Sequence, residues 1–483
     1  MKYEPVIGFE THVELATRSK VFTGTRAEFG GEPNEYVNPV CLGLPGTLPV
    51  LNRAAFEMAL KVALALDCEI PEVTIFDRKN YYYPDLPKNY QISQEYQPLG
   101  RNGRFTIVLK DGTEKTVGIH NIHLEEDAGK LIHQAIGSRY YSLVDLNRAG
   151  MSLLEIVSQP DLRSREEAEA FMETMRGLLR YLEVSDCKMQ EGSLRFELNV
   201  SIRPEGANEL GTKVEIKNIG SMRSVLRALD YEFQRQSEIL EDGGHVIQET
   251  RLWDDERGET RPMRVKEGAK DYRYFPEPDI PPIHISRDYL EALRAALPEL
   301  REAKRKRFVE QYQLPEYDAG VLTAEKSVAD YFEACCRLYE APKAYSNWIM
   351  TYILRELKGE EDKDIRDIPI PPEHLAQLVQ MVDQGIINQN IAKRVINDMI
   401  QTGHPPRRIV QEKALEVVDD TAAIEKIVEE VIAEHPDPVA RFRAGREQAL
   451  HFLLGQVMRK SRGKASPDAV REIMLRKLQS GGE

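Results

Sequence analysis

His123-Leu-Glu-Glu-Asp-Ala-Gly-Lys130 lies near the start of a stretch, residues 119–164, in which acids, bases and glycine alternate with apolar residues. Successive side chains of a strand point to opposite faces, so a strand over residues 122–127 places His123, Glu125 and Asp127 together. For a single segment, an antiparallel strand with one solvated face is the commoner explanation. The interpretation therefore depends on whether the pattern recurs.

The same alternation occurs in three further segments, residues 6–15, 194–203 and 212–217. In each, one face is apolar and the other carries carboxylates, a histidine or basic residues. These polar faces hold Glu10, His12, Glu14, Arg195, Glu197, Asn199, Arg203, Lys213, Glu215 and Lys217. Carboxylate oxygens are the ligands that Mg²⁺ prefers, while Arg and Lys suit phosphate oxygens. Brought together in one sheet, the strands would form a cradle for a metal ion and a nucleotide.

Length and composition bound the class of protein. A chain of 483 residues is too long for one core, which predicts two to four domains. The five cysteines include no CxxC pair and indicate reduced thiols, and the net charge of −14 argues against a general nucleic-acid binder. No apolar run reaches the length of a membrane span, and the first residues lead into a strand. The sequence therefore predicts a cytoplasmic protein without a membrane anchor.

Helices alternate with paired strands in the first part of the chain. Residues 53–66, 163–182 and 221–240 have the apolar periodicity of amphipathic helices, and residues 105–119 predict a hairpin that turns at Asp111-Gly112. This order favours an α+β fold with an antiparallel sheet over a doubly wound parallel sheet.

Two segments rich in proline mark domain boundaries. Prolines cluster between Pro276 and Pro282, where they fit neither a helix interior nor a central strand, and Gly403-His-Pro-Pro-Arg407 predicts a second linker. Between and beyond these linkers helical spacing dominates. It covers residues 289–309, 327–338, 346–357 and 372–382. The predicted domains are a sheet-containing domain at 1–287, an all-α domain at 288–404 and a small all-α tail at 405–483.

The tail is basic although the whole chain is acidic. Residues 441–483 hold ten Lys or Arg against four Asp or Glu, and the densest part runs from Met458 to Pro467. Charge runs usually only solvate a face. The alternative is an RNA-binding tip that contacts phosphates. Its candidate residues are Arg459, Lys460, Arg462 and Lys464.

Familiar motifs for phosphate binding and nucleophilic catalysis are absent. The sequence contains neither a Gly-x-x-x-x-Gly-Lys-Ser/Thr loop nor a Gly-x-Ser-x-Gly elbow. The only feature that suggests a reactive thiol at Cys187 is the neighbouring lysine.

Lys79 lies in a run dense in Lys, Arg and Tyr, residues 77–91. This run is either a tyrosine-rich surface loop or a clamp for a phosphate and an aromatic ring.

Several long motifs occur in a fixed order over essentially the whole chain. They include Val6-Ile-Gly-Phe-Glu-Thr-His-Val-Glu-Leu15, Asp77-Arg-Lys-Asn-Tyr-Tyr-Tyr-Pro-Asp85, His123-Leu-Glu-Glu-Asp-Ala-Gly-Lys130, Val144-Asp-Leu-Asn-Arg148, Glu191-Gly-Ser-Leu-Arg195, Glu215-Ile-Lys-Asn218 and Phe452-Leu-Leu-Gly-Gln-Val-Met458. Together they closely resemble the B subunits of the tRNA-dependent amidotransferases, the GatB family. Because so many motifs match in order, the resemblance is highly specific.

The resemblance implies an ATP-dependent enzyme that acts on glutamate or aspartate mischarged onto the tRNA for glutamine or asparagine. ATP phosphorylates the side-chain carboxylate, and ammonia then displaces the phosphate. The ammonia comes from a glutaminase partner, known as the A subunit, while the small C subunit holds the pair together, which explains the missing nucleophile. The implied fold is a cradle similar to glutamine synthetase and guanido kinases, followed by a helical domain and a tail that holds mischarged tRNA.

The resemblance also assigns residues. Glu10, His12 and Glu125 match the family's metal-binding positions, with Glu10 and Glu125 expected to be catalytic. Glu197 and Glu215 match further acidic positions, although many members have Asp at the first of these. Lys79 and Arg195 are expected to contact phosphate, with ATP and Mg²⁺ as cofactors, because a kinase site must neutralise phosphate charge.

One departure from the family concerns zinc. Many relatives carry four cysteines with the spacing of a structural zinc site, but here Thr23, Thr25 and Asn38 stand in three of these places and only Cys41 remains. No zinc is therefore expected.

Two alternatives remain open. One is a stand-alone ATP-dependent ligase acting on a free amino acid, and the other is an RNA-binding scaffold without enzymatic activity. The acidic strand faces argue against the scaffold, because they would repel RNA phosphates unless they were loaded with metal.

Overall fold

The computed structural model describes residues 2–137, 139–265, 272–357, 363–416, 421–444, 446–461, 465 and 467–480. The chain divides into two compact units, Met1–Leu300 and Arg301–Glu483. The first unit contains the sheets and the second is helical, which confirms the predicted mixed class with a large N-terminal sheet and a helical C-terminal part.

An eight-stranded sheet forms the centre of the first unit. In spatial order its strands are β13 (Glu259–Val265), β12 (Glu249–Asp254), β11 (Val214–Lys217), β10 (Leu194–Pro204), β1 (Tyr3–Glu14), β9 (Ser152–Ser158), β6 (Glu114–Glu126) and β5 (Gly100–Val108). All neighbours pair antiparallel except β11 and β12. The predicted turn at Asp111-Gly112 joins β5 to β6, and Gly112 has the φ of +86° that favours glycine.

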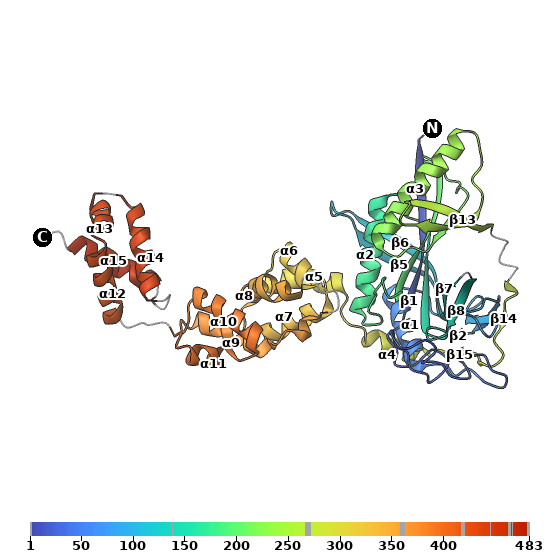
Figure 1. Ribbon diagram of the computed structural model, residues 1–483, viewed down its shortest axis with the longest axis horizontal. Helices are drawn as coiled ribbons and strands as arrows, with labels where there is room; N and C mark the ends of the chain where they lie inside the picture. Colours follow the sequence, from blue (N-terminus) through green and yellow to red (C-terminus); the bar gives the residue numbers. More distant parts are fainter. Residues whose placement is uncertain are drawn as a thin grey trace. The chain divides into compact units, whose positions relative to one another are not determined.

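Strand alternation gives this sheet an apolar face that packs against helices. Phe9 of β1 stacks on Phe171 with ring centroids 5.0 Å apart and meets the edge of Phe196 at 5.9 Å. Phe171 belongs to α2 (Arg165–Tyr181), which lies with α3 (Met222–Glu241) along this face (Figure 1). The hydroxyl oxygens of Ser164 and Ser221 cap the two helices by accepting backbone N–H groups of their first turns. The polar side chains of the strands therefore share the other face.

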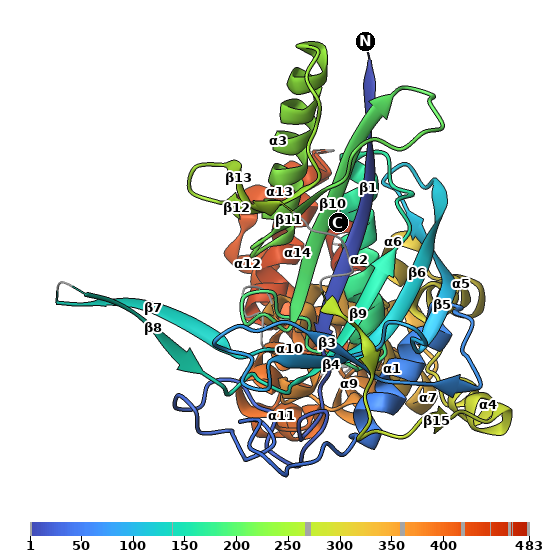
Figure 2. The same cartoon turned by 90° about the vertical axis from the view of Figure 1, so that its right-hand side faces the viewer.

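Shorter strands lie near this polar face. They are β14 (Phe275–Pro276), β3 (Asp77–Asn80) and β4 (Tyr90–Ser93) in one sheet, β15 (Ile283–His284) and β2 (Val73–Thr74) in another, and β7 (Lys130–Ile136) and β8 (Arg139–Asp145) in a hairpin. The residue after β4, Gln94, accepts a hydrogen bond from the Leu124 N–H of β6 at 2.9 Å. The hairpin extends from the rest of the unit as a ribbon (Figure 2).

Two further helices complete the first unit, α1 (Arg53–Ala65) and α4 (Arg287–Ala295). The Tyr289 hydroxyl of α4 donates to Glu57 of α1 at 3.0 Å, and Leu293 of α4 is buried in the same core as the sheet. The first unit therefore extends beyond the predicted boundary at residue 287. The helical spacing predicted over residues 289–309 does not belong to one continuous helix. It divides into α4 and α5 because Pro298, which is disfavoured in a helix interior, lies between them.

Among its described residues, the second unit contains two separate hydrophobic cores, which follow the first core, that of the sheet domain. The second core is built by α5 (Arg301–Tyr312), α6 (Glu316–Leu322), α7 (Lys326–Leu338), α8 (Pro342–Trp348), a π-helix (Ile349–Ile353), 3₁₀ turns (Leu354–Leu357 and Ile365–Asp367), α9 (Pro372–Asp383), α10 (Gln389–Thr402) and α11 (Pro406–Glu412). The third core is built by α12 (Thr421–Glu434), α13 (Pro436–Arg443), α14 (Gln448–Lys460) and α15 (Pro467–Ser480). Ile409 and Val410 of α11 are buried in the second core, so this core extends past the predicted limit at residue 404.

Candidate active site

Cross-strand pairing places four charged side chains in one row on the polar face of the sheet. His123 of β6 lies opposite Glu155 of β9, Glu155 lies opposite His12 of β1, and His12 lies opposite Arg195 of β10. Directly opposed residues share a face, so the row follows from register alone. It crosses four neighbouring strands of the sheet, β10, β1, β9 and β6, at right angles to their direction.

Glu155 connects the two imidazoles. One of its carboxylate oxygens lies 3.0 Å from His123 Nε2 and 3.3 Å from His12 Nε2. Glu125, on the same face of β6, lies 3.7 Å from His123 Nε2 and accepts a hydrogen bond from the Ser93 hydroxyl at 2.9 Å. Ligand atoms of His12, Glu125 and Glu155 all lie within 4.8 Å of one another.

A second carboxylate group lies beside this one. Glu10 pairs with Glu197 across β1 and β10, and ligand atoms of Glu10, Glu197 and Glu215 lie within 4.8 Å of one another. Lys217 partly balances them, since its Nζ lies 2.6 Å from Glu197 and 3.1 Å from Glu215. Asn199 donates to Glu10 at 3.0 Å. The two groups therefore form a continuous acidic surface with histidines at one side.

The pKa values reflect this crowding. Burial raises the pKa of Glu10, and three neighbouring carboxylates raise it further. Burial opposes protonation of the two imidazoles, but the charge of Glu155 and its hydrogen bonds, together with Glu197 at His12 and Glu125 at His123, raise the pKa of His12 to about 8 and of His123 to about 10. Burial alone would raise the pKa of Glu155, yet the two imidazoles hold it well below its usual range. Glu155 is therefore a charged anchor for both rings.

The donor set fits a hard divalent cation. Carboxylates held together this closely need a positive counter-charge, and oxygen-rich sites of this kind suit Mg²⁺. The Nε2 atom of His12 faces Glu155, while its Nδ1 atom is buried and has no hydrogen-bond partner among the described residues. A carboxylate behind an imidazole is a common support for a metal ligand, because it fixes the orientation of the ring.

Basic side chains border the acidic surface on two sides. Arg195 Nη1 lies 2.9 Å from Asp127 and 3.9 Å from Glu14, and Arg148 Nε lies 3.4 Å from Asp127. Burial would raise the pKa of Asp127, but the two arginines hold it at about 2. Burial and the Asp127 charge raise the pKa of Glu14 to about 8. The two arginines therefore already face carboxylates.

Lys79 borders the site from β3. Its Nζ lies 5.1 Å from the centroid of the Tyr272 ring and 6.0 Å from that of Tyr81, which is cation–π distance. Burial would lower the pKa of Lys79, but Glu125, Glu155 and the neighbouring tyrosines together raise it above its ordinary value. The ammonium is therefore charged at neutral pH and is held beside two tyrosine rings.

The structure brings together most of the residues singled out in the sequence. The five expected metal ligands, Glu10, His12, Glu125, Glu197 and Glu215, lie on one face in two adjoining groups. Lys79 and Arg195 border them, although Arg195 is paired with Asp127. Sequence reasoning missed Glu155. The roles of these residues in metal and phosphate binding stay predictions.

The expected tRNA contacts in the tail are only partly described. Arg459 is exposed at the end of α14, whereas Lys460 pairs with Glu430 at 2.8 Å and with Glu434 at 2.6 Å. Arg462 and Lys464 lie outside the described residues. Their role in RNA binding stays a prediction.

Thr23, Thr25, Asn38 and Cys41, which stand at the positions of the zinc-binding cysteines of many relatives, form a hydrogen-bonded network. Asn38 donates to the Thr23 hydroxyl, and the Cys41 thiol lies 3.8 Å from the Thr25 hydroxyl and 3.6 Å from Nζ of the buried Lys20. That the protein binds no zinc stays a prediction. Among the described residues, no helix combines the length and apolar character needed to cross a membrane.

The fold and site define a class of protein in which one face of a mainly antiparallel sheet presents carboxylates and histidines suited to a divalent cation. Models of two families match the chain, the GatB/GatE catalytic domain at residues 5–291 and the GatB domain at residues 330–478. The chain therefore belongs to the GatB family of amidotransferase B subunits, components of a ligase-type enzyme, which confirms the resemblance seen in its motifs.

Relatives match over almost the whole chain. The B subunit of the aspartyl/glutamyl-tRNA(Asn/Gln) amidotransferase from Carboxydothermus hydrogenoformans is 52% identical over 478 residues, which is 99% of both chains. Its counterparts from Moorella thermoacetica and Thermoanaerobacter sp. are 52% and 51% identical over 99% of this chain and 100% of theirs.

Proposed function

We propose that the chain catalyses the amide-forming step of a tRNA-dependent amidotransferase. In this step the side-chain carboxylate of Glu-tRNA(Gln), Asp-tRNA(Asn) or both is phosphorylated by ATP and then attacked by ammonia. The products are Gln-tRNA(Gln) and Asn-tRNA(Asn). The names of the relatives, which include both aspartyl- and glutamyl-tRNA, support this substrate class. We also propose that the sheet domain shares the fold of glutamine synthetase and guanido kinases.

The observation that carries the proposal is the pair of adjoining ligand groups on one face, His12–Glu125–Glu155 and Glu10–Glu197–Glu215. A carboxylate is a poor acyl donor, and phosphorylation gives it a good leaving group. Mg²⁺, when bound, neutralises phosphate charge and orients phosphate oxygens. Both ligand groups and the cations that border them face the same side of the sheet, where a nucleotide and a carboxylate substrate can meet.

The chain's own side chains hold the metal ligands in place and supply positive charge to the phosphate. Glu155 holds His12 and His123 in place, and Ser93 holds Glu125 by donating a hydrogen bond. Lys79 offers a positive charge to transferred phosphate oxygens without a proton loss at neutral pH, because its pKa is raised. Arg195 contacts phosphate in this proposal once the substrate competes with Asp127 for its guanidinium.

Partner subunits complete the proposal. The sequence offers no recognisable amidase nucleophile, so ammonia comes from the glutaminase partner, the A subunit, with the small C subunit stabilising the assembly. The tail holds the tRNA through basic residues, of which Arg459 is exposed. The alternative of a ligase for free amino acids is not favoured, because relatives at about half identity over the full chain carry tRNA substrates in their names.

The experiment is an amidation assay with the chain purified together with its partner subunits. Glu-tRNA(Gln) and Asp-tRNA(Asn) are supplied separately with ATP, Mg²⁺ and glutamine, and the esterified amino acid is identified after deacylation. Amide formation that requires both ATP and charged tRNA is expected. The chain alone should not hydrolyse glutamine but should use ammonium slowly. Equal amidation of free glutamate or aspartate without tRNA would favour the ligase alternative.

A further inference from the structure

A hollow of ≈ 740 Å³ lies between α13 and α14 in the last helical core. Its lining consists of Pro438, Arg441, Arg446, Glu447, Gln448, Ala449 and Phe452. The volume falls within the range of small-molecule sites, which is about 300 to 1,000 Å³. None of these residues belongs to the candidate active site or to the predicted basic tip.

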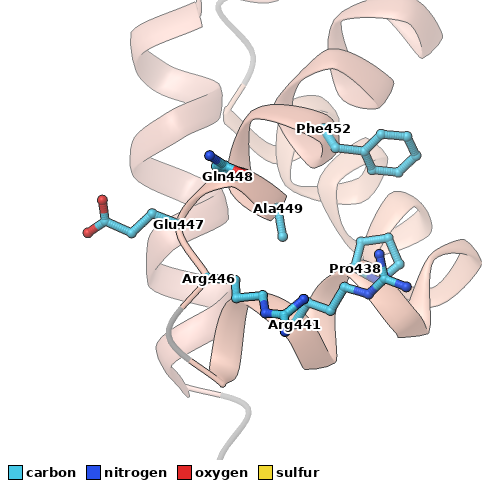
Figure 3. A pocket seen from close by; sticks show the side chains of 7 residues that line it. All are labelled: Pro438, Arg441, Arg446, Glu447, Gln448, Ala449 and Phe452. Carbon is cyan, nitrogen blue, oxygen red and sulfur yellow. The ribbon is translucent and has the colours of Figure 1, made fainter.

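Two arginines form one side of this hollow. The backbone N–H of Arg446 donates to the Arg441 carbonyl at 3.1 Å, so the chain returns toward α13 before α14 begins. Figure 3 shows the two guanidinium-bearing side chains along one rim, with the small Ala449 side chain between them and Phe452. Glu447, the acidic residue of the lining, points away from the hollow in the same view.

Phe452 forms the opposite side. Phe452 is 46% exposed, so part of its ring is open to solvent. The His435 ring meets it edge to face, with centroids 5.4 Å apart and an interplanar angle of 85°. The contact fixes the orientation of the phenylalanine ring and leaves part of it open to solvent. An exposed ring held in this way is a platform for another flat ring.

The lining of the hollow carries two arginines and one glutamate, so its net charge is positive. Neither Arg441 nor Arg446 has a side-chain hydrogen bond or ion pair among the described residues of the tail. The lysines of the same helical core differ, since Lys460 pairs with Glu430 and Lys477 with Glu429 at 2.7 Å. Two free guanidiniums beside an aromatic ring are complementary to a phosphate attached to a base.

We infer that this hollow binds one unstacked nucleotide of the RNA substrate, with its base on Phe452 and its phosphate on Arg441 and Arg446. The inference rests on the proposed function, because it takes charged tRNA as the substrate. An acidic peptide would also meet the arginines, but it would leave the exposed face of the ring unused. A nucleotide uses both features.

The inferred site is distinct from the predicted basic tip. Phe452 lies in the first half of α14, and Arg459 and Lys460 lie at its end. At a rise of about 1.5 Å per residue, Phe452 lies roughly 12 Å along the helix axis from Lys460. The RNA would therefore contact α14 at two places, one of which reads an exposed base.

The test measures tRNA affinity of the full complex over a salt series. The variants are Phe452→Leu and the double change Arg441→Gln with Arg446→Gln. Arg471→Gln, an exposed arginine of α15 that does not line the hollow, is the matched control. Circular dichroism melting confirms that each variant remains folded.

Phe452→Leu and the double arginine variant should both weaken tRNA binding, but only the second should change its salt dependence. Phe452→Leu should raise the dissociation constant about tenfold with an unchanged salt slope, because it removes stacking and no charge. The double arginine variant should weaken binding and reduce the salt slope by about 0.7 for each phosphate contact that it removes. Arg471→Gln should change neither quantity appreciably.

Failure of this inference is distinguishable from failure of the proposed function. A wild-type complex that neither binds nor amidates charged tRNA would overturn the proposed function. If the wild type does both, but the Phe452 and double arginine variants match Arg471→Gln, only the nucleotide site is overturned. That second result would also be obtained if the hollow binds an acidic peptide.

Discussion

At Glu155 a single carboxylate oxygen faces two imidazole Nε2 atoms, at 3.0 and 3.3 Å. Both nitrogens must carry a proton to donate to it, which agrees with the raised pKa values of the two imidazoles. The Nδ1 atom of His123 then lies 3.1 Å from the Asn121 side chain, while that of His12 has no partner among the described residues. Any further contact of the His12 ring would therefore be made through Nδ1.

Glu155→Gln should weaken metal binding while the chain remains folded. The amide keeps the size of the side chain but removes the charge that orients both rings, and loss of such a supporting group typically costs about 10- to 100-fold in metal affinity. Mn²⁺ binding, followed by electron paramagnetic resonance on the purified complex, measures the effect. Glu173→Gln, an exposed glutamate of α2, is the control. Equal Mn²⁺ affinity in the two variants would remove Glu155 from the site.

Glu125→Gln should abolish ATP-dependent activation. Glu125 combines a hydrogen bond from Ser93 with proximity to His123 and Lys79, so the amide preserves packing and removes one charged ligand. A loss of roughly 100-fold or more in ATP hydrolysis with charged tRNA is expected, as for other groups that stabilise a transition-state charge. Turnover at the wild-type rate would exclude Glu125 from the mechanism.

At the scale of a single element, two adjacent residues of β6 have different roles. One belongs to the candidate active site and the other stabilises the fold. Glu125 faces the acidic surface, whereas the next residue, Glu126, lies on the other face. There it is 5% exposed, accepts the Ile92 N–H at 2.9 Å and pairs with Lys88. Because side chains alternate along a strand, one position serves chemistry and its neighbour fixes β4 against β6.

Glu126→Gln should therefore destabilise the sheet domain without removing a site ligand. Losing a buried, charge-assisted hydrogen bond costs about 1.5 to 3 kcal/mol, which lowers the melting temperature by roughly 3 to 10 °C. Calorimetry of this variant beside Glu125→Gln provides the comparison. A melting temperature that falls for Glu125→Gln and not for Glu126→Gln would contradict the assignment of faces.

Local alternation predicted the strand faces that carry Glu10, His12 and Glu125, because several polar residues share each of those faces. Glu155 could not be found in this way. Its strand reads Ser152-Leu-Leu-Glu-Ile-Val-Ser158, and the neighbours on its face are Leu153 and Val157. A single acidic residue between two apolar residues does not mark that face of the strand as polar. Its role depends on strand order, since β9 lies between β1 and β6, and strand order is a long-range property.

The first compact unit ends later than the predicted boundary for a related reason. Residues 289–309 have continuous helical periodicity, but α4 packs on α1 in the first core while α5 contributes Phe308 to another. The prolines at 276–282 predict a boundary because proline interrupts regular structure. A proline can end a helix or strand while the chain continues to pack into the same hydrophobic core. Only tertiary contacts show where that core ends.

At the scale of the whole molecule, the three hydrophobic cores define where the chain can be divided. The second core includes Ile409, Val410 and Leu415, and the third begins at Ile424. A truncation at residue 407 would remove α11 from the second core and expose its apolar partners. A cut that removes residues 421–483 leaves the first two cores complete. Its effect on RNA binding can therefore be measured without destabilising the rest of the chain.

Removing residues 421–483 should raise the Michaelis constant for charged tRNA and flatten its dependence on salt. The deleted part carries the basic tip and the hollow between α13 and α14, and the salt slope falls by about 0.7 to 0.9 for each phosphate that is no longer neutralised. Glutamine hydrolysis by the glutaminase partner should change little, and so should ATP binding to the sheet domain, because the ligands on the sheet belong to a different core. Steady-state amidation by the truncated and full-length complexes at several salt concentrations measures the effect, and the melting temperature of the remaining cores is the control. Equal Michaelis constants and equal slopes would mean that the basic residues only solvate the helix ends and that the tRNA is held elsewhere.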